Sequence, residues 1–435
     1  MSSVIASTTQ TVRPARTVRG SVRLPGDKSI SHRYAMLAGL ASGTSKFANF
    51  STGADPHSSL ACMEALGATV VKKTDGTIEV TGVGGVFQQP TRELDCGNSG
   101  STMRMLAGLV APHPGTYTFV GDASLTKRPM QRIKGPLEQM GARVELTEGH
   151  APMTIHGGPL TAIDFATPIA SAQVKTAVLF AGLGASGTTT LQEAVRTRDH
   201  SEHALRAFGA ELERGRDSIS IRGGQPLQAI EAVVPGDLSS AAFFLCAALL
   251  FPDSQLVLDD VGMNPSRSTL LDVLAGMGLK VQVLNLEEKH GEMIGTLQVN
   301  GAAVLKGAEI SGNLPALIID ELPVLAAIGP YTRDGVTIRD AKELRVKESD
   351  RIALVVQNLR AMGAEVEEFE DGMHIPGGQT LQGGVIDSAD DHRIAMAFSI
   401  AALRAAGKTT IQGAEAAAIS FPEFFTLLDR ISERA

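Results

Sequence analysis

The tripeptide Pro-Gly-Asp occurs twice in this chain, at Pro25-Gly26-Asp27 and at Pro235-Gly236-Asp237. Each copy lies in a polar turn that precedes a segment rich in small apolar residues. The copies are roughly 210 residues apart, and a repeat at this distance indicates two related halves. We therefore predict two domains, and we place the points where the chain crosses from one to the other near Leu24 and Val234.

Six polar turns of this kind open segments of Ala, Leu and Met. Because these segments are apolar on nearly all sides, we expect six buried helices. The turns are Asp27-Lys28-Ser29, Asn98-Ser99-Gly100-Ser101, Ser171-Ala172-Gln173, Gly236-Asp237-Leu238-Ser239, Asp320-Glu321-Leu322-Pro323 and Asp390-Asp391-His392-Arg393.

A second signal recurs five times: a large apolar residue, a glycine, and then alternating residues. This pattern is typical of a helix that ends at a left-handed glycine and is followed by a strand. It occurs at residues 66–70, 140–144, 208–212, 277–281 and 362–366. Together the two signals predict six repeated units, three in each half. Because the units mix strands with helices, the fold class is α/β or α+β.

The composition excludes several classes of protein. With 43% hydrophobic and 20% charged residues, the chain has the composition of a globular protein. Its net charge of −8 and its 4% of aromatic residues argue against a sequence-independent nucleic-acid binder. The longest apolar run, residues 241–251, is too short to span a bilayer, and no secretion signal opens the chain. The three cysteines lack metal-ligand spacing and fit a reducing compartment, so we expect a cytoplasmic protein without membrane or nucleic-acid partners.

Basic side chains gather at the predicted helix starts. A helix N-terminus offers free N–H groups and a positive dipole end, which together bind anions. An acidic protein with its cations at such turns has the character of a binder of small polyanions. The alternative is that each cation pairs with a nearby acid on a solvated surface. The cations are Lys28, Arg33, Arg104, Arg128, Lys175, Arg198, Lys347, Arg351 and Arg393.

Two acids stand beside these cations. Glu348 and Arg351 are three residues apart and would share a helix face, either as a surface ion pair or within a site. Asp320 follows an apolar run at a predicted helix start, where an acid is usually a cap. An acid beside a lysine in a cleft would instead be suited to act as a general base. His32, between polar residues, would be a cap partner.

Nine segments in order resemble the 5-enolpyruvylshikimate-3-phosphate synthase family (3-phosphoshikimate 1-carboxyvinyltransferases). The resemblance covers nearly the whole chain after about residue 15. The segments are PGDKSISHR at 25–33, GNSGSTMR at 97–104, GDASLTKRPM at 121–130, SAQVK at 171–175, TRDHSE at 197–202, IDELPVLA at 319–326, RVKESDRI at 345–352, DDHRIAM at 390–396 and SFPEF at 420–424.

The resemblance implies an α/β (α+β) fold, a two-domain inside-out α/β barrel with three βαβαββ repeats in each domain, helices inside and sheets outside. Residues 1–24 and 235–435 would form the first, discontinuous domain, and residues 25–234 the second. The implied reaction moves the enolpyruvyl group of phosphoenolpyruvate to the 5-hydroxyl of shikimate 3-phosphate and releases phosphate. It belongs to the shikimate pathway, which leads through chorismate to aromatic amino acids. The resemblance implies no metal and no cofactor, and we expect a monomer.

The resemblance also implies roles for single residues. Asp320 would take the proton of the 5-hydroxyl, Glu348 would lie near the methylene carbon that is protonated, and Lys28 would touch both substrates. Shikimate 3-phosphate would be bound by Lys28, Ser29, Arg33, Ser171, Ala172, Gln173, Arg198, Asp320 and Lys347. Phosphoenolpyruvate would be bound by Lys28, Asn98, Gly100, Arg128, Gln173, Arg351 and Arg393.

The inhibitor glyphosate occupies the phosphoenolpyruvate site in this family, and some resistant members carry Ala where this chain has Gly100. We therefore expect this protein to be glyphosate-sensitive. Many members carry a Lys just before a Thr-Phe-Pro segment near the C-terminus, where this chain has Ile419-Ser420-Phe421-Pro422. A group of bacterial members with Ser-Ala-Gln in the middle also lacks that Lys.

Two other functions stay open at this point. A sister enzyme that transfers enolpyruvyl to UDP-N-acetylglucosamine shares the architecture, but it has Lys-Asn where this chain has Lys28-Ser29 and a loop Cys that is absent near Arg128. A non-catalytic polyanion-binding protein would need no acid beside its lysines, whereas Asp320 and Glu348 are present here.

Overall fold

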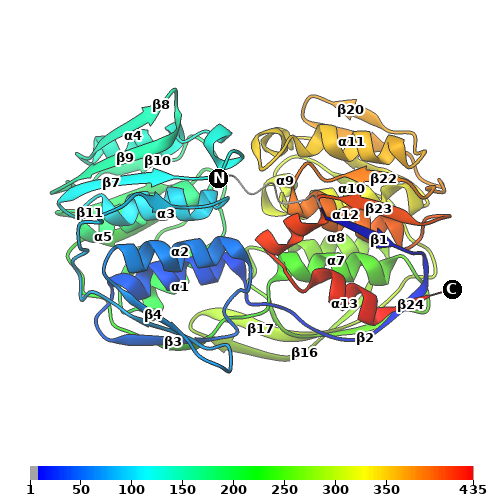
Figure 1. Cartoon of the computed structure of the whole chain (residues 1–435), viewed down its shortest axis with the longest axis horizontal. Coiled ribbons are helices and arrows are strands. Elements are labelled where there is room, and N and C mark those ends of the chain that lie inside the picture. The colour runs from blue at the N-terminus through cyan, green and yellow to red at the C-terminus, as the bar shows by residue number, and fades with distance from the viewer. Residues whose placement is uncertain (1–7, 435) are drawn as a thin grey trace. The chain divides into compact units, whose positions relative to one another are not determined.

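A computed structural model describes residues 8–434. The described chain divides into two compact units, one of residues 26–235 with 288–292 and one of residues 8–25, 236–287 and 293–434 (Figure 1). The predicted domain boundaries, after residues 24 and 234, differ from these limits by one residue each, and the prediction did not include residues 288–292. The predicted first domain also contains residues 1–7 and 435, which lie outside the described residues. No helix in the described part of the chain is long and apolar enough to cross a membrane.

The unit of residues 26–235 contains three four-stranded sheets, with strand orders β14-β3-β5-β4, β6-β7-β9-β8 and β10-β11-β13-β12. Its helices are α1 (Lys28–Leu40), α2 (Ala54–Ala65), α3 (Gly100–Val110), α4 (Gln131–Gln139), α5 (Ala172–Gly184) and α6 (His200–Ala207), with the 3₁₀ turn η1 (Leu125–Lys127). Its strands are β3 (Thr44–Ala48), β4 (Thr69–Lys72), β5 (Ile78–Thr81), β6 (Leu94–Asp95), β7 (Gly115–Val120), β8 (Arg143–Thr147), β9 (His150–Gly157), β10 (Asp164–Ala166), β11 (Thr188–Gln192), β12 (Leu212–Arg214), β13 (Ser218–Arg222) and β14 (Glu231–Val233).

The other unit has sheets with strand orders β16-β17-β15-β2-β24, β18-β19-β21-β20 and β1-β23-β22. Its helices are α7 (Leu238–Leu249), α8 (Thr269–Met277), α9 (Leu314–Leu317), α10 (Leu322–Ile328), α11 (Arg351–Ala361), α12 (His392–Ala402) and α13 (Phe424–Ile431), with the 3₁₀ turns η2 (Gly329–Tyr331), η3 (Lys342–Val346) and η4 (Ala414–Ile419). Its strands are β1 (Thr9–Val12), β2 (Ala15–Arg23), β15 (Gln255–Gly262), β16 (Lys280–Lys289), β17 (Glu292–Asn300), β18 (Ala308–Ile310), β19 (Val336–Ile338), β20 (Glu367–Phe369), β21 (Gly372–Ile375), β22 (Val385–Asp387), β23 (Thr409–Gln412) and β24 (Ser432–Arg434).

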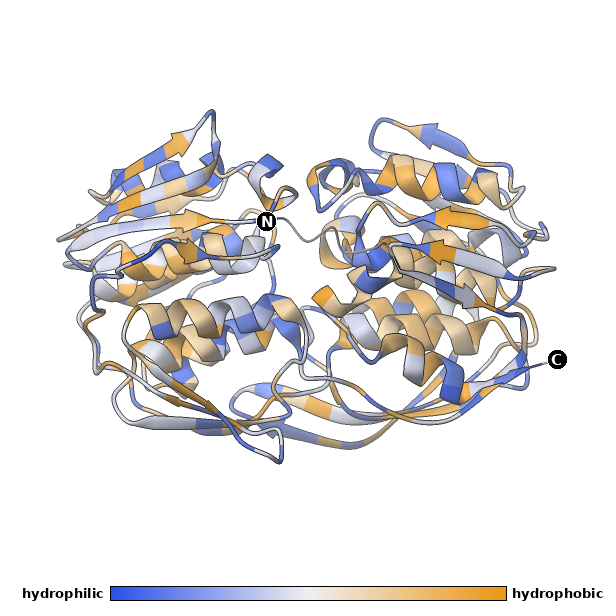
Figure 2. Cartoon of the chain, in the orientation of Figure 1, coloured by the Kyte–Doolittle hydropathy of each residue, from blue (hydrophilic) through white to orange (hydrophobic). Residues whose placement is uncertain are grey.

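The six predicted helix starts each begin a buried helix. These helices are α1, α3 and α5 in one unit and α7, α10 and α12 in the other. All twelve residues of α7 are buried, and in Figure 2 this helix has the colour of apolar residues along most of its length. The strands bury alternate residues, so Tyr117 and Phe119 of β7 lie opposite Ile155 and Met153 of β9 in the core.

The second sequence signal is also confirmed. The glycine of each predicted helix end has a positive φ, between +85° and +115°, and a strand follows it. Such a φ is accessible to Gly without steric cost, which explains why the pattern repeats. The five positions are Gly67, Gly141, Gly209, Gly278 and Gly363.

The topology repeats from sheet to sheet. In the β6-β7-β9-β8 sheet the first two strands are parallel and the remaining pairs are antiparallel, and β18-β19-β21-β20 has the same arrangement. The sixth repeat differs from the expected βαβαββ pattern. Its sheet contains β22 and β23 from the repeat itself, and β1 from the start of the chain supplies the antiparallel neighbour of β23. The chain continues into α13 and β24 instead of a hairpin, and β24 pairs with β2.

The two units exchange their first strands: the strand that precedes α1 in sequence pairs in the other unit, and so does the strand that precedes α7. Strand β14 ends the 26–235 segment and pairs in parallel with β3, whereas β2, which directly precedes α1 in sequence, pairs in parallel with β15. The two Pro-Gly-Asp turns hold this arrangement. The N–H of Asp27 donates to the carbonyl oxygen of Pro235 (2.7 Å), and the N–H of Asp237 donates to that of Pro25 (3.0 Å).

Helices α3 and α5 pack closely because α3 has a glycine at their contact. A β carbon added to Gly108 would lie 2.1 Å from the carbonyl oxygen of Ala177. We therefore expect Gly108→Ala to lower the free energy of unfolding by about 1–3 kcal/mol, the usual cost of overpacking a core. Gly135, inside α4 with no atom within 4 Å of its added β carbon, is the matched control. Gly135→Ala is expected to be neutral or to stabilise by up to about 1 kcal/mol.

Urea denaturation of both variants, followed by circular dichroism, measures this difference. Equal unfolding midpoints for Gly108→Ala and the unmodified protein would contradict the close contact between the two helices.

Candidate functional site

The turn that opens α1 places a lysine beside a buried acid. Asp27 caps the helix, and its carboxylate accepts the N–H of Ile30 (3.0 Å). Lys28, in the first turn, pairs with Asp55 at the start of α2 (3.1 Å), and its side chain keeps 17% of its surface exposed. Lys28 and Ser29 therefore lie in the first turn of a helix, and their role in binding an anion stays a prediction.

Arg33, one turn further along α1, is bound mainly within the protein. It donates from Nε to Ser201 Oγ, from Nη2 to Thr176 Oγ1, and from Nη1 to the carbonyl oxygen of Ser29, each at 2.8 Å. Burial lowers the pKa of Arg33 to about 10. Because every nitrogen already has a partner, this arginine ties α1 to α5 and α6 in addition to any ligand contact.

The turn before α3 binds the side chain of a second arginine, Arg128. Ser99 caps α3 and accepts the N–H of Thr102 (3.0 Å). Asn98 donates to Asp122 (2.7 Å), and Arg128 donates to the side-chain oxygen of Asn98 (2.6 Å) and to its backbone oxygen (3.0 Å). The structure thus brings Asn98 and Arg128 together beside the first residue of α3, Gly100.

The turn before α5 is linked to the turn before α3. Ser171 caps α5, and Ala172 and Gln173 follow in its first turn. Gln173 accepts from Arg104 (2.8 Å) and donates to Ser101 Oγ (2.9 Å). Arg104 was among the predicted cations but not among the predicted site residues. Its guanidinium connects the two helix starts.

A buried lysine anchors the loop that carries Arg198. Lys175 has no exposed surface, and it donates to Glu202 (2.9 Å), to Glu193 (3.3 Å) and to the carbonyl oxygen of Thr197 (3.2 Å). Glu193 in turn accepts the N–H of Thr197 (3.1 Å). Lys175 thus pairs with two buried acids and fixes the residue next to Arg198, so its role here is to hold the loop.

In the other unit, three cations surround the carboxylate of Asp320. Its Oδ1 lies 3.8 Å from Lys347, 3.8 Å from Arg351 and 4.0 Å from Arg393, and its backbone oxygen accepts from Arg393 (2.7 Å). The cap position of α10 is Glu321, which makes no side-chain cap bond, so Asp320 is not the cap of this helix. Its side chain is 19% exposed.

Arg351 is the centre of a buried cluster of charges. It donates to Asp391 (2.8 Å) and to Glu348 (2.5 Å), and Ser349 also donates to Asp391 (2.8 Å). Burial alone would lower the pKa of Arg351, but Asp391, Glu348 and Asp320 raise it above its ordinary value. Burial would raise the pKa of Asp391, but the charge of Arg351 lowers it. The predicted Glu348–Arg351 pair therefore exists, within the protein rather than on a solvated surface.

The structure groups the predicted residues into two sets, one in each unit. Sequence reasoning missed the acids that fix the cations, because Asp55 and Asp391 are distant in sequence from the side chains they hold. One weak signal was present: Asp391 belongs to a predicted helix start, and it also caps α12 through the N–H of Arg393 (2.9 Å).

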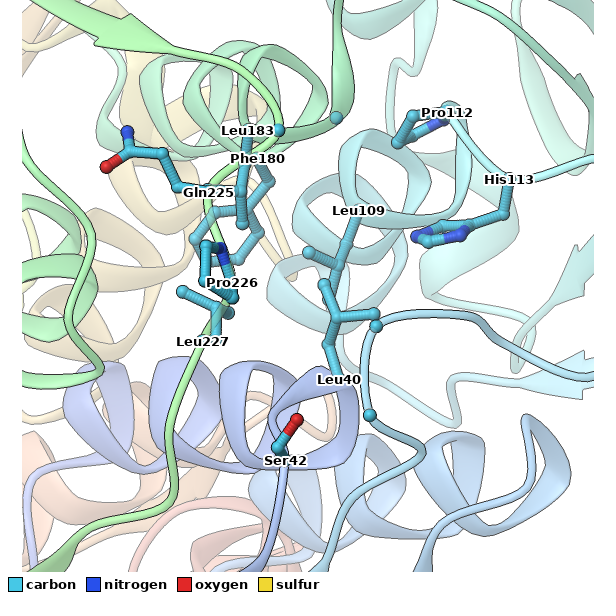
Figure 3. Close-up of a pocket in the computed structure, with 14 residues that line it drawn as sticks. Leu40, Ser42, Leu109, Pro112, His113, Phe180, Leu183, Gln225, Pro226 and Leu227 are labelled. Atoms are coloured by element: carbon cyan, nitrogen blue, oxygen red, sulfur yellow. The ribbon is translucent and has the colours of Figure 1, made fainter.

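A cavity of about 280 Å³ lies elsewhere in the 26–235 unit (Figure 3). It is lined at the C-terminal ends of three central helices by Leu40 of α1, Leu109 of α3 and Leu183 of α5, and by the nearby Pro226 and Leu227. The predicted binding residues Lys28, Gly100 and Gln173 lie at the N-terminal ends of the same helices. None of them lines this cavity, so it is not the candidate site.

Two α/β units with cation-rich helix starts define a protein class suited to small anionic substrates. A family model of EPSP synthase (3-phosphoshikimate 1-carboxyvinyltransferase) matches residues 12–428. The 3-phosphoshikimate 1-carboxyvinyltransferase of Koribacter versatilis (strain Ellin345) is 62% identical over 423 residues, which cover 97% of this chain and 99% of that protein. The solved EPSP synthase of Acinetobacter baumannii is 38% identical, with a TM-score of 0.86 and 98% of each chain covered. An enolpyruvyl transferase of Streptomyces tendae, 19% identical, shares the fold with a TM-score of 0.79 over 97% of this chain and 96% of that one.

The chain belongs to the EPSP synthase family. It is an enzyme, and its reaction is enolpyruvyl transfer in the shikimate pathway. The sister activity on UDP-N-acetylglucosamine is not favoured, and the predicted two-domain α/β fold is confirmed.

His32 gives a pH-dependent prediction. Burial and the positive charges of Lys28 and Arg33 lower the pKa of His32 well below its ordinary value. In the unfolded chain the His32 side chain therefore becomes protonated near pH 6.5, whereas in the folded protein it stays neutral at that pH. As the pH falls below about 6.5, the free energy of unfolding should decrease by up to about 1.4 kcal/mol per pH unit, until the folded pKa is reached.

Urea titrations at pH 7.5, 6.5 and 5.5 on the unmodified protein and on His32→Asn measure this effect. The variant lacks the titrating group, so its stability should fall less steeply across the range. Parallel pH profiles for the two proteins would show that His32 is not held neutral.

Proposed function

We propose that the transfer runs from phosphoenolpyruvate to the 5-hydroxyl of shikimate 3-phosphate and releases phosphate, with the two residue sets described above acting on these substrates. The observation that carries the proposal is the environment of Asp320. A carboxylate at a helix start that it does not cap, with three cations within 4.0 Å, is stabilised in its charged form. Such a group can accept a proton from a substrate hydroxyl.

The proposed binding residues match the charges of the substrates. Each substrate carries a phosphate and a carboxylate, and arginine forks and helix N-termini suit both groups. Shikimate 3-phosphate is assigned to Lys28, Ser29, Arg33, Ser171, Ala172, Gln173, Arg198, Asp320 and Lys347. Phosphoenolpyruvate is assigned to Lys28, Asn98, Gly100, Arg128, Gln173, Arg351 and Arg393.

The proposed chemistry has two steps, an addition and an elimination. In the addition, the methylene carbon of phosphoenolpyruvate gains a proton while the 5-oxygen attacks the adjacent carbon and loses its proton to Asp320. In the elimination, the new methyl group loses a proton and the C–O bond to phosphate breaks, which restores the double bond. Glu348 is assigned to the carbon proton, and Lys28 bridges the substrates and balances the charge of the departing phosphate.

Phosphate release from phosphoenolpyruvate that depends on shikimate 3-phosphate tests the proposal directly. Release that instead depends on UDP-N-acetylglucosamine would replace it with the sister activity. Binding of both anions with no turnover would indicate a non-catalytic polyanion-binding protein.

Asp320→Ala is expected to lower kcat by roughly 10²- to 10⁴-fold, the usual contribution of a general base. Stability should change little, because the cap position of α10 is Glu321 and not Asp320. Asp334→Ala in the same unit, which removes an acid with half of its side chain exposed (49%), is the control and should keep normal turnover. Near-normal kcat in Asp320→Ala, measured on protein with an unchanged circular dichroism spectrum, would contradict the role of the base.

Gly100→Ala is expected to raise the inhibition constant of glyphosate more than the KM for phosphoenolpyruvate. The structure gives a physical reason: a β carbon at Gly100 would lie 2.8 Å from Arg104 Nη1 and 3.5 Å from Arg128 Nη1. A methyl group there would crowd the arginines around the site, and a longer ligand has less room to adjust. Gly100 is not among the residues with positive φ, so its backbone angle does not require glycine.

Both constants, measured for both proteins in the phosphate-release assay, decide the matter. An equal rise in the two constants, or a parent enzyme that already tolerates glyphosate, would show that Gly100 does not set the room for the inhibitor.

We also propose a cytoplasmic monomer. All three cysteines are reduced and buried, which fits a reducing compartment. Sedimentation at micromolar concentration tests the oligomeric state, and fractionation of cells tests the location.

A further inference from the structure

A buried chain of hydroxyl groups connects α1 to α3 through α2. His32 Nδ1 lies 2.7 Å from Ser59 Oγ, and Ser59 Oγ lies 2.8 Å from Thr102 Oγ1. Thr102 Oγ1 then donates to Ser99 Oγ (2.9 Å), the cap of α3. All four side chains have no exposed surface. A polar chain at this depth keeps its geometry because water cannot replace any member.

Two further links join α5 to α1 and to α3 near the N-termini of these helices. Arg33 of α1 donates to Thr176 of α5 (2.8 Å). Arg104 of α3 donates to Gln173 of α5, which donates back to Ser101 of α3. Each pair of central helices in the 26–235 unit is therefore connected by polar contacts within the first turns. The link between α1 and α3 is the one built only from uncharged side chains, since the pKa of His32 is lowered.

We propose that His32, Ser59 and Thr102 are positioning residues that hold the turn at the start of α3 in register with the turn at the start of α1. This inference rests on the proposed function, which assigns Asn98 and Gly100 of the α3 turn to phosphoenolpyruvate. The α1 turn carries the lysine assigned to both substrates. A shift of the α3 turn would therefore weaken contacts with phosphoenolpyruvate and leave most contacts with shikimate 3-phosphate in place.

A substitution at Thr102 is the simplest way to interrupt this series of side-chain hydrogen bonds. Its hydroxyl contacts both Ser59 and Ser99, and its N–H donates to Ser99 as well. Valine has nearly the same shape but no hydroxyl, so Thr102→Val breaks two contacts at once and leaves both serines without that partner. Serine keeps the hydroxyl and removes only the methyl group.

The matched control is Thr189→Val. Thr189 lies in β11 of the same unit, is fully buried, and its hydroxyl has no hydrogen-bond partner within residues 8–434. It therefore reports what a buried Thr-to-Val change costs without a polar chain.

We expect Thr102→Val to raise the KM for phosphoenolpyruvate by roughly tenfold, since small displacements of positioning groups have effects of this size or larger. The KM for shikimate 3-phosphate should stay within about twofold of the parent value, Thr102→Ser should restore the parent constants, and Thr189→Val should change neither constant. An equal rise in both KM values, or a Thr102→Ser variant as impaired as Thr102→Val, would overturn the proposal.

Amide hydrogen exchange on the unliganded protein gives a second readout that needs no activity. Exchange at residues 99–103 should be faster in Thr102→Val than in Thr102→Ser or Thr189→Val. If Thr102→Val does not fold, Ser59→Ala cuts the chain at the preceding member and carries the same two expectations. A parent protein without phosphate release that depends on shikimate 3-phosphate would overturn the proposed function, whereas unchanged exchange at the α3 turn would overturn the link itself.

Discussion

The structure depends on one constraint: the first N–H groups of its buried central helices need hydrogen-bond acceptors. The first turn of any helix leaves N–H groups without partners in the helix itself. In five of the six central helices of the described chain, a side-chain oxygen at the cap position accepts one of them: Asp27, Ser99, Ser171, Asp237 and Asp391. The remaining N–H groups of each first turn lie at the positive end of the helix dipole. Helix N-termini of this kind are suited to binding anions, as the proposed function requires.

The sixth central helix, α10, breaks this rule where chemistry is proposed. Its start has two adjacent acids, Asp320 and Glu321, and Glu321 at the cap position makes no side-chain cap bond. Glu321 instead accepts from Ser239, and Asp320 lies among three cations. An acid at a helix start usually caps the helix. One that is surrounded by cations instead departs from this rule, and such departures are expected at functional positions.

The sequence predicted those parts of the fold that a few neighbouring residues decide. Caps and left-handed glycines are local, so six helix starts and five helix ends could be identified from short patterns. The incomplete sixth repeat and the position of β1 could not be predicted, because they depend on pairing between the two ends of the chain. In the site, residue types and turns were predictable, whereas partners such as Asp55 for Lys28 were not. The role of Arg33 shows the same limit, since its hydrogen bonds to α5 and α6 arise only when distant segments meet.

The exchange of first strands affects the order in which the chain can fold during synthesis. Strand β2 leaves the ribosome before the 26–235 segment, but its parallel partner β15 begins only at residue 255. At about 5–20 residues per second, β2 waits on the order of ten to fifty seconds for that partner. During the same interval the whole 26–235 segment emerges, and β14 can pair with β3 to complete the β14-β3-β5-β4 sheet. The 26–235 segment can therefore form its sheets before β15 is synthesised. During that time β2, which directly precedes this segment in the chain, has no parallel partner.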